Sequence, residues 1–246
     1  MTRRLVALGL LVVVVAVLAG CTGPLGGGPV DRAALAGNQT YDWNTTANTT
    51  LTVQRNDLLA VYTVENQSTI PVYTFGRFND VRPVTPSSVA FRYPNGTVVG
   101  PEALNVTRSN SKTLIRLPQP RGQLAMTLPK NGKLVRVPVV VPGSHEVVLP
   151  PNTDVQYPLV GRVVPAPNRR FVGPDGRVHL VWHDVSGDRL VVEYYLDRDL
   201  VVFGALATAA GLVVVGGLVF FWLQLRRLRE RRSEVAWDED ESSSGR

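Results

Sequence analysis

Residues 189–223, RLVVEYYLDRDLVVFGALATAAGLVVVGGLVFFWL, decide the architecture because they join a strand pattern directly to a long apolar run. The last 24 residues of this stretch, 200–223, contain no charged side chain. As a helix they extend about 36 Å, which exceeds the roughly 30 Å of a bilayer's hydrocarbon core. Since every face of that helix is apolar, the sequence predicts a transmembrane segment and not a buried core helix.

The charges on either side of this segment predict its orientation. Residues 197–199 read Asp-Arg-Asp, whereas arginines crowd the region after the apolar run. Arginine-rich flanks stay on the cytoplasmic side of a membrane. We therefore expect a single-pass protein with residues 224–246 as a basic-then-acidic cytoplasmic tail and the larger part outside the cell. The topology-determining residues are Arg226, Arg227, Arg229, Arg231 and Arg232.

The first residues have the layout of an export signal. Arg3 and Arg4 precede an apolar run of 16 residues, 5–20, which is too short to span a bilayer comfortably. The run ends in the sequence LAGC, residues 18–21, which resembles the lipobox of bacterial and archaeal lipoproteins. The resemblance implies that residues 1–20 are a cleaved signal peptide and that Cys21 carries a lipid. The arginine pair leaves open whether export follows the general or the twin-arginine route.

A stretch rich in Gly, Pro, Asn and Thr follows, and residues 21–50 are predicted to be a flexible tether behind the lipid. The chain contains six Asn-x-Ser/Thr sequons, three of them within this tether. Sequons mark acceptors for N-glycosylation in exported proteins, so they support a surface location. The candidate glycosylation sites are Asn38, Asn44, Asn48, Asn66, Asn95 and Asn105.

Residues 51–196 are interpreted as a β-rich extracellular domain. Short runs of Val, Leu, Tyr and Thr alternate with turn signals, and Asn95-Gly96 and Asn131-Gly132 suit tight hairpins. The pattern predicts a mainly β fold, an immunoglobulin-like or related β-sandwich, plus one C-terminal transmembrane helix. Tyr194 and Tyr195 are expected to lie at the membrane surface. Predicted strands cover 58–64, 72–75, 88–93, 97–99, 112–117, 123–128, 134–141, 146–149, 159–164, 177–182 and 189–196.

Motifs that carry chemistry are sparse. Cys21 is the only cysteine, which excludes an intrachain disulfide. No G-x-S-x-G elbow or glycine-rich phosphate loop is present, and we predict no catalytic residue, cofactor or bound metal. The segment His179-Leu-Val-Trp-His183 supplies the alternative, a metal-dependent envelope enzyme or binder. On a strand these two histidines share a face but lie about 13 Å apart, which is too far for one ion.

Several of these features together resemble an uncharacterised family of haloarchaeal membrane lipoproteins. They are the LAGC sequence, the Asn/Thr-rich tether, the segments DGRVHLVW at 175–182 and YYLDRDL at 194–200, and the arginine-flanked helix. The resemblance covers most of the chain. It implies an archaeal cell envelope and a lipid on Cys21, and it brings no established activity.

The sequence favours a noncatalytic binding or scaffolding module of the cell envelope. The net charge of +6 is spread along the chain, and no segment is basic enough to indicate a nucleic-acid partner. The expected partners are the lipid bilayer and an unidentified envelope protein or glycan. Small residues at Gly204, Thr208 and Gly211 also suit a homodimer through the membrane helix. A transmembrane signalling subunit is the remaining alternative.

Overall fold

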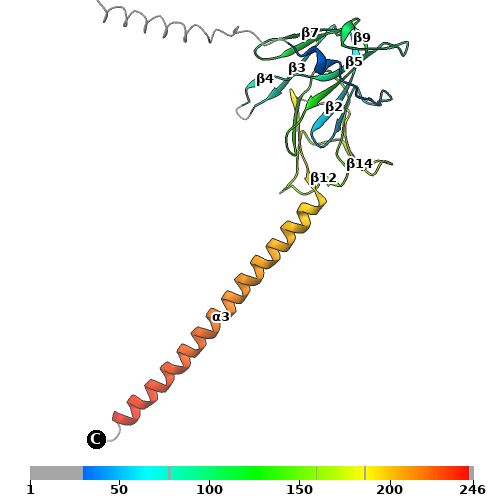
Figure 1. Ribbon diagram of the computed structural model, residues 1–246. Coiled ribbons are helices and arrows are strands. Elements are labelled where there is room, and N and C mark those ends of the chain that lie inside the picture. The colour runs from blue at the N-terminus through cyan, green and yellow to red at the C-terminus, as the bar shows by residue number, and fades with distance from the viewer. Residues whose placement is uncertain (1–29, 77–78, 159, 186, 244–246) are drawn as a thin grey trace, which may run out of the picture. The chain divides into compact units, whose positions relative to one another are not determined.

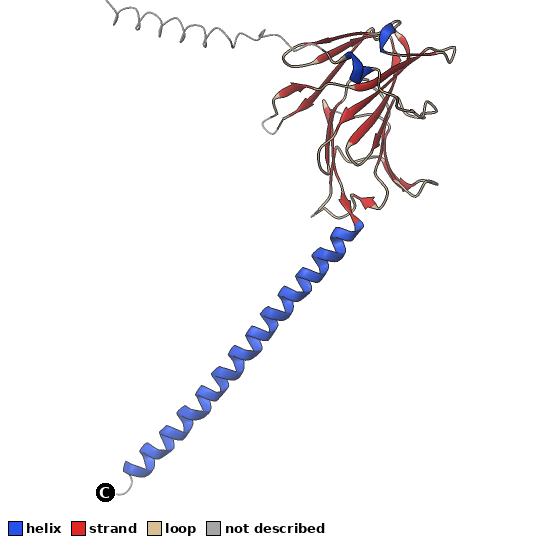
Figure 2. Cartoon of the chain, viewed as in Figure 1, coloured by secondary structure: helices blue, strands red, loops and turns tan. Residues whose placement is uncertain are grey.

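The computed structural model describes residues 30–76, 79–158, 160–185 and 187–243. Contacts divide the chain into two compact units, with the boundary between Tyr195 and Leu196. The first unit is built from strands, and the second is a helix (Figures 1 and 2). The predicted signal peptide and Cys21 lie outside the described residues.

An eight-stranded sheet forms one layer of the β-rich unit (Figure 1). The central strands β1 and β11 pair in parallel, with Thr49 opposite His145, and the other neighbours pair antiparallel. In order across the sheet, the strands are β14 (Arg169–Val172), β15 (Val178–Trp182), β11 (His145–Val148), β1 (Thr49–Val53), β2 (Asp57–Glu65), β9 (Arg121–Pro129), β5 (Ser87–Arg92) and β6 (Val98–Val99).

Smaller sheets form the second layer. A four-stranded sheet has the order β4 (Val81–Pro83), β3 (Thr69–Phe75), β8 (Thr113–Arg116) and β7 (Asn105–Arg108). A three-stranded sheet has the order β10 (Leu134–Pro138), β16 (Arg189–Glu193) and β13 (Arg162–Val164). β12 (Thr153–Asp154) pairs with β17 (Tyr195–Leu196), and two short helical turns, α2 (Arg32–Leu35) and η1 (Pro101–Ala103), complete the unit.

One hydrophobic core joins the two layers. Val53 and Leu124 of the large sheet belong to the same buried cluster as Ile70 of β3, Ile115 of β8 and Leu190 of β16. The strands alternate between buried and more exposed positions, as the period of two in a strand requires. The mainly β fold with a C-terminal apolar helix is therefore confirmed, and its layers pack as a sandwich.

The expected flexible tether differs from the structure. Residues 38–47, which we call the strap, lie against the outer face of the large sheet, where Tyr41 and Trp43 pack on Val61 and Ala125. The Tyr41 hydroxyl donates to the Ser88 carbonyl oxygen at 2.7 Å. Burial raises the pKa of Tyr41 to about 12. The strap is held by its aromatic side chains and leads into β1, which begins at Thr49. Residues 38–50 are therefore part of the folded domain and not of a flexible tether.

Tyr194 and Tyr195 are not surface aromatics. Both side chains are buried in the β-rich unit, and the Tyr194 hydroxyl accepts a hydrogen bond from Lys130 at 2.9 Å. The Tyr195 ring contacts the ring of Tyr157 at 5.9 Å between centroids. Tyr157 is 55% exposed and follows β12, the strand that pairs with β17. The exposed aromatic side chain of this pair is therefore Tyr157.

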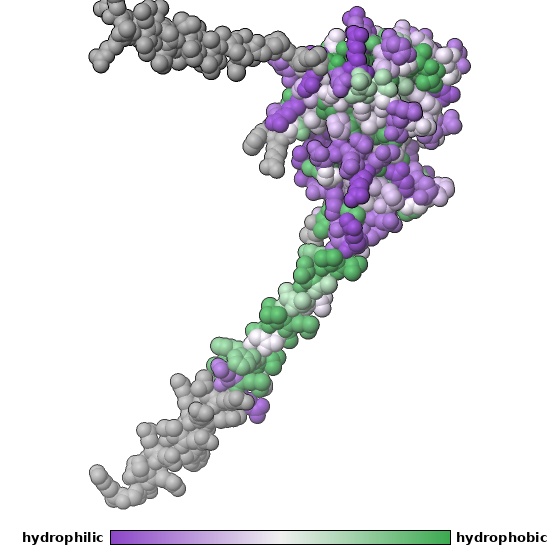
Figure 3. Space-filling model, in the orientation of Figure 1, coloured by the Kyte–Doolittle hydropathy of each residue, from purple (hydrophilic) through white to green (hydrophobic). Residues whose placement is uncertain are grey.

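The helical unit consists of α3 (Asp197–Ser243), which begins at the residue after β17. The Asp199 carboxylate accepts a hydrogen bond from the Leu196 N–H at 3.3 Å, and negative charge in a first turn favours helix initiation. Large apolar side chains are exposed along the helix, including Val213 at 76% and Phe220 at 65% (Figure 3). Among the described residues, one stretch, Asp197–Arg226, is long and apolar enough to cross a membrane.

Candidate functional site

His179 lies at the centre of a polar cluster on the outer face of the large sheet. Its Nδ1 is 2.8 Å from a carboxylate oxygen of Glu146 on β11, and its Nε2 is 3.3 Å from a carboxylate oxygen of Asp175. The Phe171 ring stacks on the imidazole at 4.9 Å between centroids. Both ring nitrogens are therefore engaged by acids, and the ring orientation is fixed by an aromatic neighbour.

His183 is not part of this cluster. It is exposed just beyond β15, and its backbone N–H donates to the Asn168 side-chain oxygen at 3.0 Å. Within the described ranges, no group of three or more His, Cys, Asp or Glu side chains is arranged to hold a metal ion. The structure thus pairs His179 with Glu146 and Asp175 and does not bring it together with His183.

The third histidine supplies a prediction about pH. His145 is 2% exposed, and burial lowers its pKa although the Gly143 carbonyl and Asp184 act in the opposite direction. The unfolded chain takes up this proton near pH ~6.5, whereas the folded chain does so only at lower pH, so stability falls as the pH drops below about 6.5. We expect His145→Gln to flatten this loss, measured by denaturant unfolding of the full chain at about pH 7.5 and about pH 5.5. The exposed control His183→Gln should keep the wild-type pH dependence, and a wild-type dependence in His145→Gln would refute the assignment.

The His179 cluster opens into an acidic groove of about 430 Å³ beside the strap. Thr50 and Thr52 of β1 line it, and Asp42 of the strap adds a third carboxylate to those of Glu146 and Asp175. Slight burial would raise the pKa of Asp175, but hydrogen bonds from the Arg177 backbone N–H and from His179 outweigh it and lower that pKa. The Arg177 guanidinium is occupied by the carbonyl oxygens of Leu149 at 2.6 Å and Val53 at 2.8 Å. Negative charge therefore dominates this groove.

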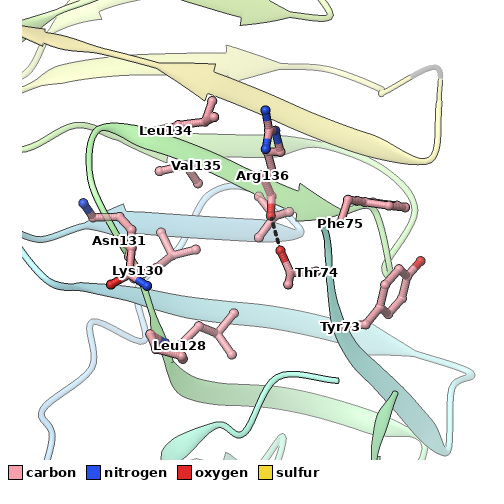
Figure 4. Close-up of a pocket in the computed structure, with 12 residues that line it drawn as sticks. Tyr73, Thr74, Phe75, Leu128, Lys130, Asn131, Leu134, Val135 and Arg136 are labelled. Atoms are coloured by element: carbon pink, nitrogen blue, oxygen red, sulfur yellow. Dashed lines mark hydrogen bonds between the residues drawn. The ribbon is translucent and has the colours of Figure 1, made fainter. Parts of the chain in front are cut away.

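A second recess has the opposite charge. It lies where β3 meets β10, has a volume of about 280 Å³ and is lined mainly by apolar side chains such as Leu128 and Val135 (Figure 4). The Thr74 hydroxyl donates to the Arg136 carbonyl oxygen at 3.4 Å and ties the two strands together. We call this recess the basic pocket, since its charged lining residues are Lys130 and Arg136.

Lys130 is the feature of the basic pocket that sequence reasoning missed. The residue is 8% exposed, and its ammonium donates to the Gly132 carbonyl oxygen at 2.6 Å and to the Tyr194 hydroxyl at 2.9 Å. Tyr194 is 64 residues away along the chain. The local sequence Lys130-Asn131-Gly132 signals only a turn, so nothing near it in the sequence indicates burial.

Two further cations lie over the aromatic rings at the other end of the basic pocket. The Lys112 ammonium is 4.7 Å from the ring centroid of Tyr73, and the Arg189 guanidinium is 4.7 Å from that of Phe75. Partial burial, followed by the charge of Asp188, raises the pKa of Tyr73, so its hydroxyl stays neutral at physiological pH. Arg189 is paired with Asp188 at 3.2 Å, so the cations beside this mainly apolar pocket that have no acidic partner among the described residues are Lys130, Arg136 and Lys112.

The candidate glycosylation sites are distributed over the β-rich unit. Asn48 is half-buried, and its side-chain oxygen accepts hydrogen bonds from the backbone N–H of Ser144 at 3.1 Å and from its hydroxyl at 2.8 Å. The remaining five sequon asparagines are exposed: Asn38, Asn44, Asn66, Asn95 and Asn105. Their exposure keeps all five available as acceptors, and glycosylation itself stays a prediction.

The predicted topology residues lie in the second half of α3. The Arg226 guanidinium is 5.9 Å from the ring centroid of Trp222, at the end of the apolar stretch. Arg227, Arg229, Arg231 and Arg232 belong to the same helix. Within the apolar stretch, the Thr208 hydroxyl donates to the Gly204 carbonyl oxygen at 2.8 Å, so its hydrogen-bond donor is paired within the helix.

A β-rich domain followed by one apolar helix of sufficient length is consistent with a single-pass membrane protein. The chain belongs to a family of unknown function, DUF5803, whose family model matches residues 45–240. The match runs from just before β1 through most of α3, so it covers the described strands and most of the helix of this chain. No curated protein and no solved structure matches the chain.

Proposed function

We propose that this protein is a noncatalytic, membrane-anchored surface module that holds its β-rich domain outside the cell and binds or scaffolds another envelope component. The observation that carries the proposal is the direct succession of β17 and α3, because the last strand ends at Leu196 and the helix begins at Asp197. A domain joined in this way to a membrane-spanning helix is held close to the membrane surface. An exposed apolar helix surface supports insertion into lipid.

Charge supports the proposed orientation. Acidic residues occupy the first turn of α3, whereas the five predicted topology arginines follow the apolar stretch. The positive-inside rule places such arginines in the cytoplasm. The C-terminal tail would then be cytoplasmic, and the β-rich unit with its five exposed sequon asparagines would be extracellular.

Lipid attachment at Cys21 supplies the second anchor in this proposal. A chain held at Cys21 and by α3 has one anchor before the sandwich in the sequence and one after it, which suits a fixed scaffold more than a diffusing enzyme. The lipobox and the resemblance to haloarchaeal membrane lipoproteins support the assignment. We expect Cys21→Ser to abolish lipid addition and processing, which intact-mass measurement of the purified chain detects as a retained signal and the absence of a lipid increment. Thr22→Ser is the matched control, and a mature mass in Cys21→Ser that differs from wild type only by the substitution would contradict lipidation.

The proposed binding role rests on the two recesses of opposite charge. Photo-crosslinking in intact cells tests it, with the crosslinker placed at Thr52 in the acidic groove or at Tyr73 in the basic pocket. Val98, which is 49% exposed on the edge strand β6, is the control position. We expect a crosslinker at Thr52 or Tyr73 to form adducts with another envelope component, and a crosslinker at Val98 to form none. Equal labelling from all three positions, or none, would argue against a binding module.

A further inference from the structure

The lining of the basic pocket is asymmetric in charge and in polarity. Its lining residues include two bases, Lys130 and Arg136, and no acid. Figure 4 shows Lys130 and Asn131 at one end and Tyr73 and Phe75 at the other, with Leu128 and Val135 in between. The pocket therefore has a polar, cationic end and an apolar, aromatic end.

Among the described residues, Lys130 has no acidic partner. Both acceptors of its ammonium, the Gly132 carbonyl and the Tyr194 hydroxyl, are neutral. In the described part of the chain, no carboxylate lies within ion-pair distance of this ammonium. Burying an ammonium without a counter-charge is costly, and an ammonium has three N–H donors. The ammonium also lies 5.4 Å from the ring centroid of Tyr194, a contact that is favourable but carries no formal counter-charge. The two hydrogen bonds brace the turn, and these contacts leave the third N–H donor for a ligand.

One further cation, Lys112, lies beside the aromatic end of the pocket. Lys112 and Arg189 cover the faces of Tyr73 and Phe75, which fixes both rings. The Arg189 charge is offset by Asp188 at 3.2 Å, so Lys112 supplies the added positive charge at the aromatic end. The acidic groove on the large sheet has the opposite composition, with Asp42, Glu146 and Asp175. A ligand attracted to one recess would be repelled by the other, because charge complementarity selects between them.

We propose that the basic pocket binds an organic anion with one carboxylate or phosphate group on a short apolar or aromatic body. The anionic group contacts Lys130 at the polar end, and the body packs against Leu128 and Val135 and reaches Tyr73. A volume of about 280 Å³ admits a body of roughly one ring or a short alkyl chain. The inference rests on the binding role proposed above and names the ligand chemistry of that role. It does not depend on which side of a membrane the domain occupies.

The test is a calorimetric titration of the full chain in nanodiscs of zwitterionic lipid, with empty nanodiscs as the blank. The probes are 3-phenylpropionate, phenyl phosphate and the neutral isostere 3-phenylpropionamide. We expect both anions to bind and the amide to bind about tenfold or more weakly, since a hydrogen-bonded charge interaction is lost. The ratio between the two anions distinguishes a carboxylate ligand from a phosphate ligand.

Lys130→Met should abolish the preference for the anions over the amide, and Lys130→Arg should retain it. Arg116→Met, an exposed residue of β8 outside the pocket lining, is the matched control and should bind as wild type does. Thermal unfolding of each variant checks that the fold persists. If Lys130→Met does not fold, the proposal is judged from the ratio of anion affinity to amide affinity in the wild type and in Lys130→Arg, which should favour the anions in both. Equal binding of anions and amide, no binding of any probe to the wild type, or an unchanged preference in a folded Lys130→Met would overturn the proposal. None of these results would alter the membrane anchoring proposed above, which is tested separately.

Discussion

Trp182→Ala is expected to lower the free energy of unfolding by about 3–5 kcal/mol, the usual effect of removing a large buried aromatic side chain. Trp182 is 1% exposed, belongs to the core that joins the two layers, and donates from its indole nitrogen to the Pro165 carbonyl oxygen at 3.1 Å. The substitution leaves a cavity and an unpaired carbonyl oxygen. Denaturant unfolding of the detergent-solubilised full chain, followed by the ellipticity of the strands, measures the change.

His183→Ala is the matched control, because this neighbouring residue is exposed and its backbone N–H makes the bond to Asn168. Its effect should stay within about 0.5 kcal/mol. A loss below about 1 kcal/mol for Trp182→Ala would mean that the two layers do not share a continuous core at this point.

The double substitution Val213→Arg with Val214→Arg is expected to prevent stable membrane insertion of α3. Both side chains are exposed near the middle of the apolar stretch. An arginine at the centre of a membrane helix costs about 2.5 to 3.5 kcal/mol on insertion scales, so the pair opposes insertion strongly. The Cys21→Ser background is required, because a lipid on Cys21 would otherwise retain the chain. Alkaline extraction of membranes should then release the double variant and leave the Cys21→Ser parent behind.

Val213→Leu with Val214→Leu in the same background is the control and should stay in the membrane pellet. If the double arginine variant also stayed there, α3 would not be the anchor. Release of the leucine variant would point instead to a specific packing role for the two valines.

The sequence predicts those strands whose side chains alternate clearly. The predicted strands at 58–64 and 123–128 correspond to β2 and β9, which pair along their full lengths from Asp57 opposite Pro129 to Glu65 opposite Arg121. The predicted hairpin at Asn95-Gly96 joins β5 to β6, and Gly96 adopts the left-handed conformation with φ of +89°. Period-two patterning and turn residues are local signals, so they can be recognised without tertiary information.

Five of the described strands were not predicted: β1, β4, β7, β12 and β14. For two of them, β1 and β14, the composition imitates other structures. β1, with the sequence TTLTV at Thr49–Val53, continues an Asn/Thr-rich stretch that is typical of a tether, yet it pairs with β2 and β11 at the centre of the large sheet. β14, with the sequence RRFV, carries charges that suggest a solvated loop. Both strands are stabilised by backbone hydrogen bonds to neighbouring strands, and these pairings cannot be read from local composition.

The candidate sites depend on long-range contacts that a single sequence does not reveal. His179 meets Glu146 across 33 residues, and Lys130 meets Tyr194 across 64. From the sequence, His183 entered only in the alternative of a metal site, because alternation along a strand places it on the same face as His179. Register between β15 and β11, with Val148 opposite His179, is what brings Glu146 within reach. The burial of Lys130 likewise follows from a long-range contact, the hydrogen bond to the Tyr194 hydroxyl.

The central claim, that α3 crosses the membrane with the β-rich unit outside, is tested most directly by cysteine labelling in intact cells. Cys21 is the only native cysteine, so Cys21→Ser gives a cysteine-free background for Val98→Cys on β6 and Ser233→Cys beyond the arginines. A membrane-impermeant maleimide should label Val98→Cys in intact cells and Ser233→Cys only after lysis. Labelling of Ser233→Cys in intact cells with protection of Val98→Cys would contradict this orientation, and equal labelling of both before lysis would show that α3 does not cross the membrane.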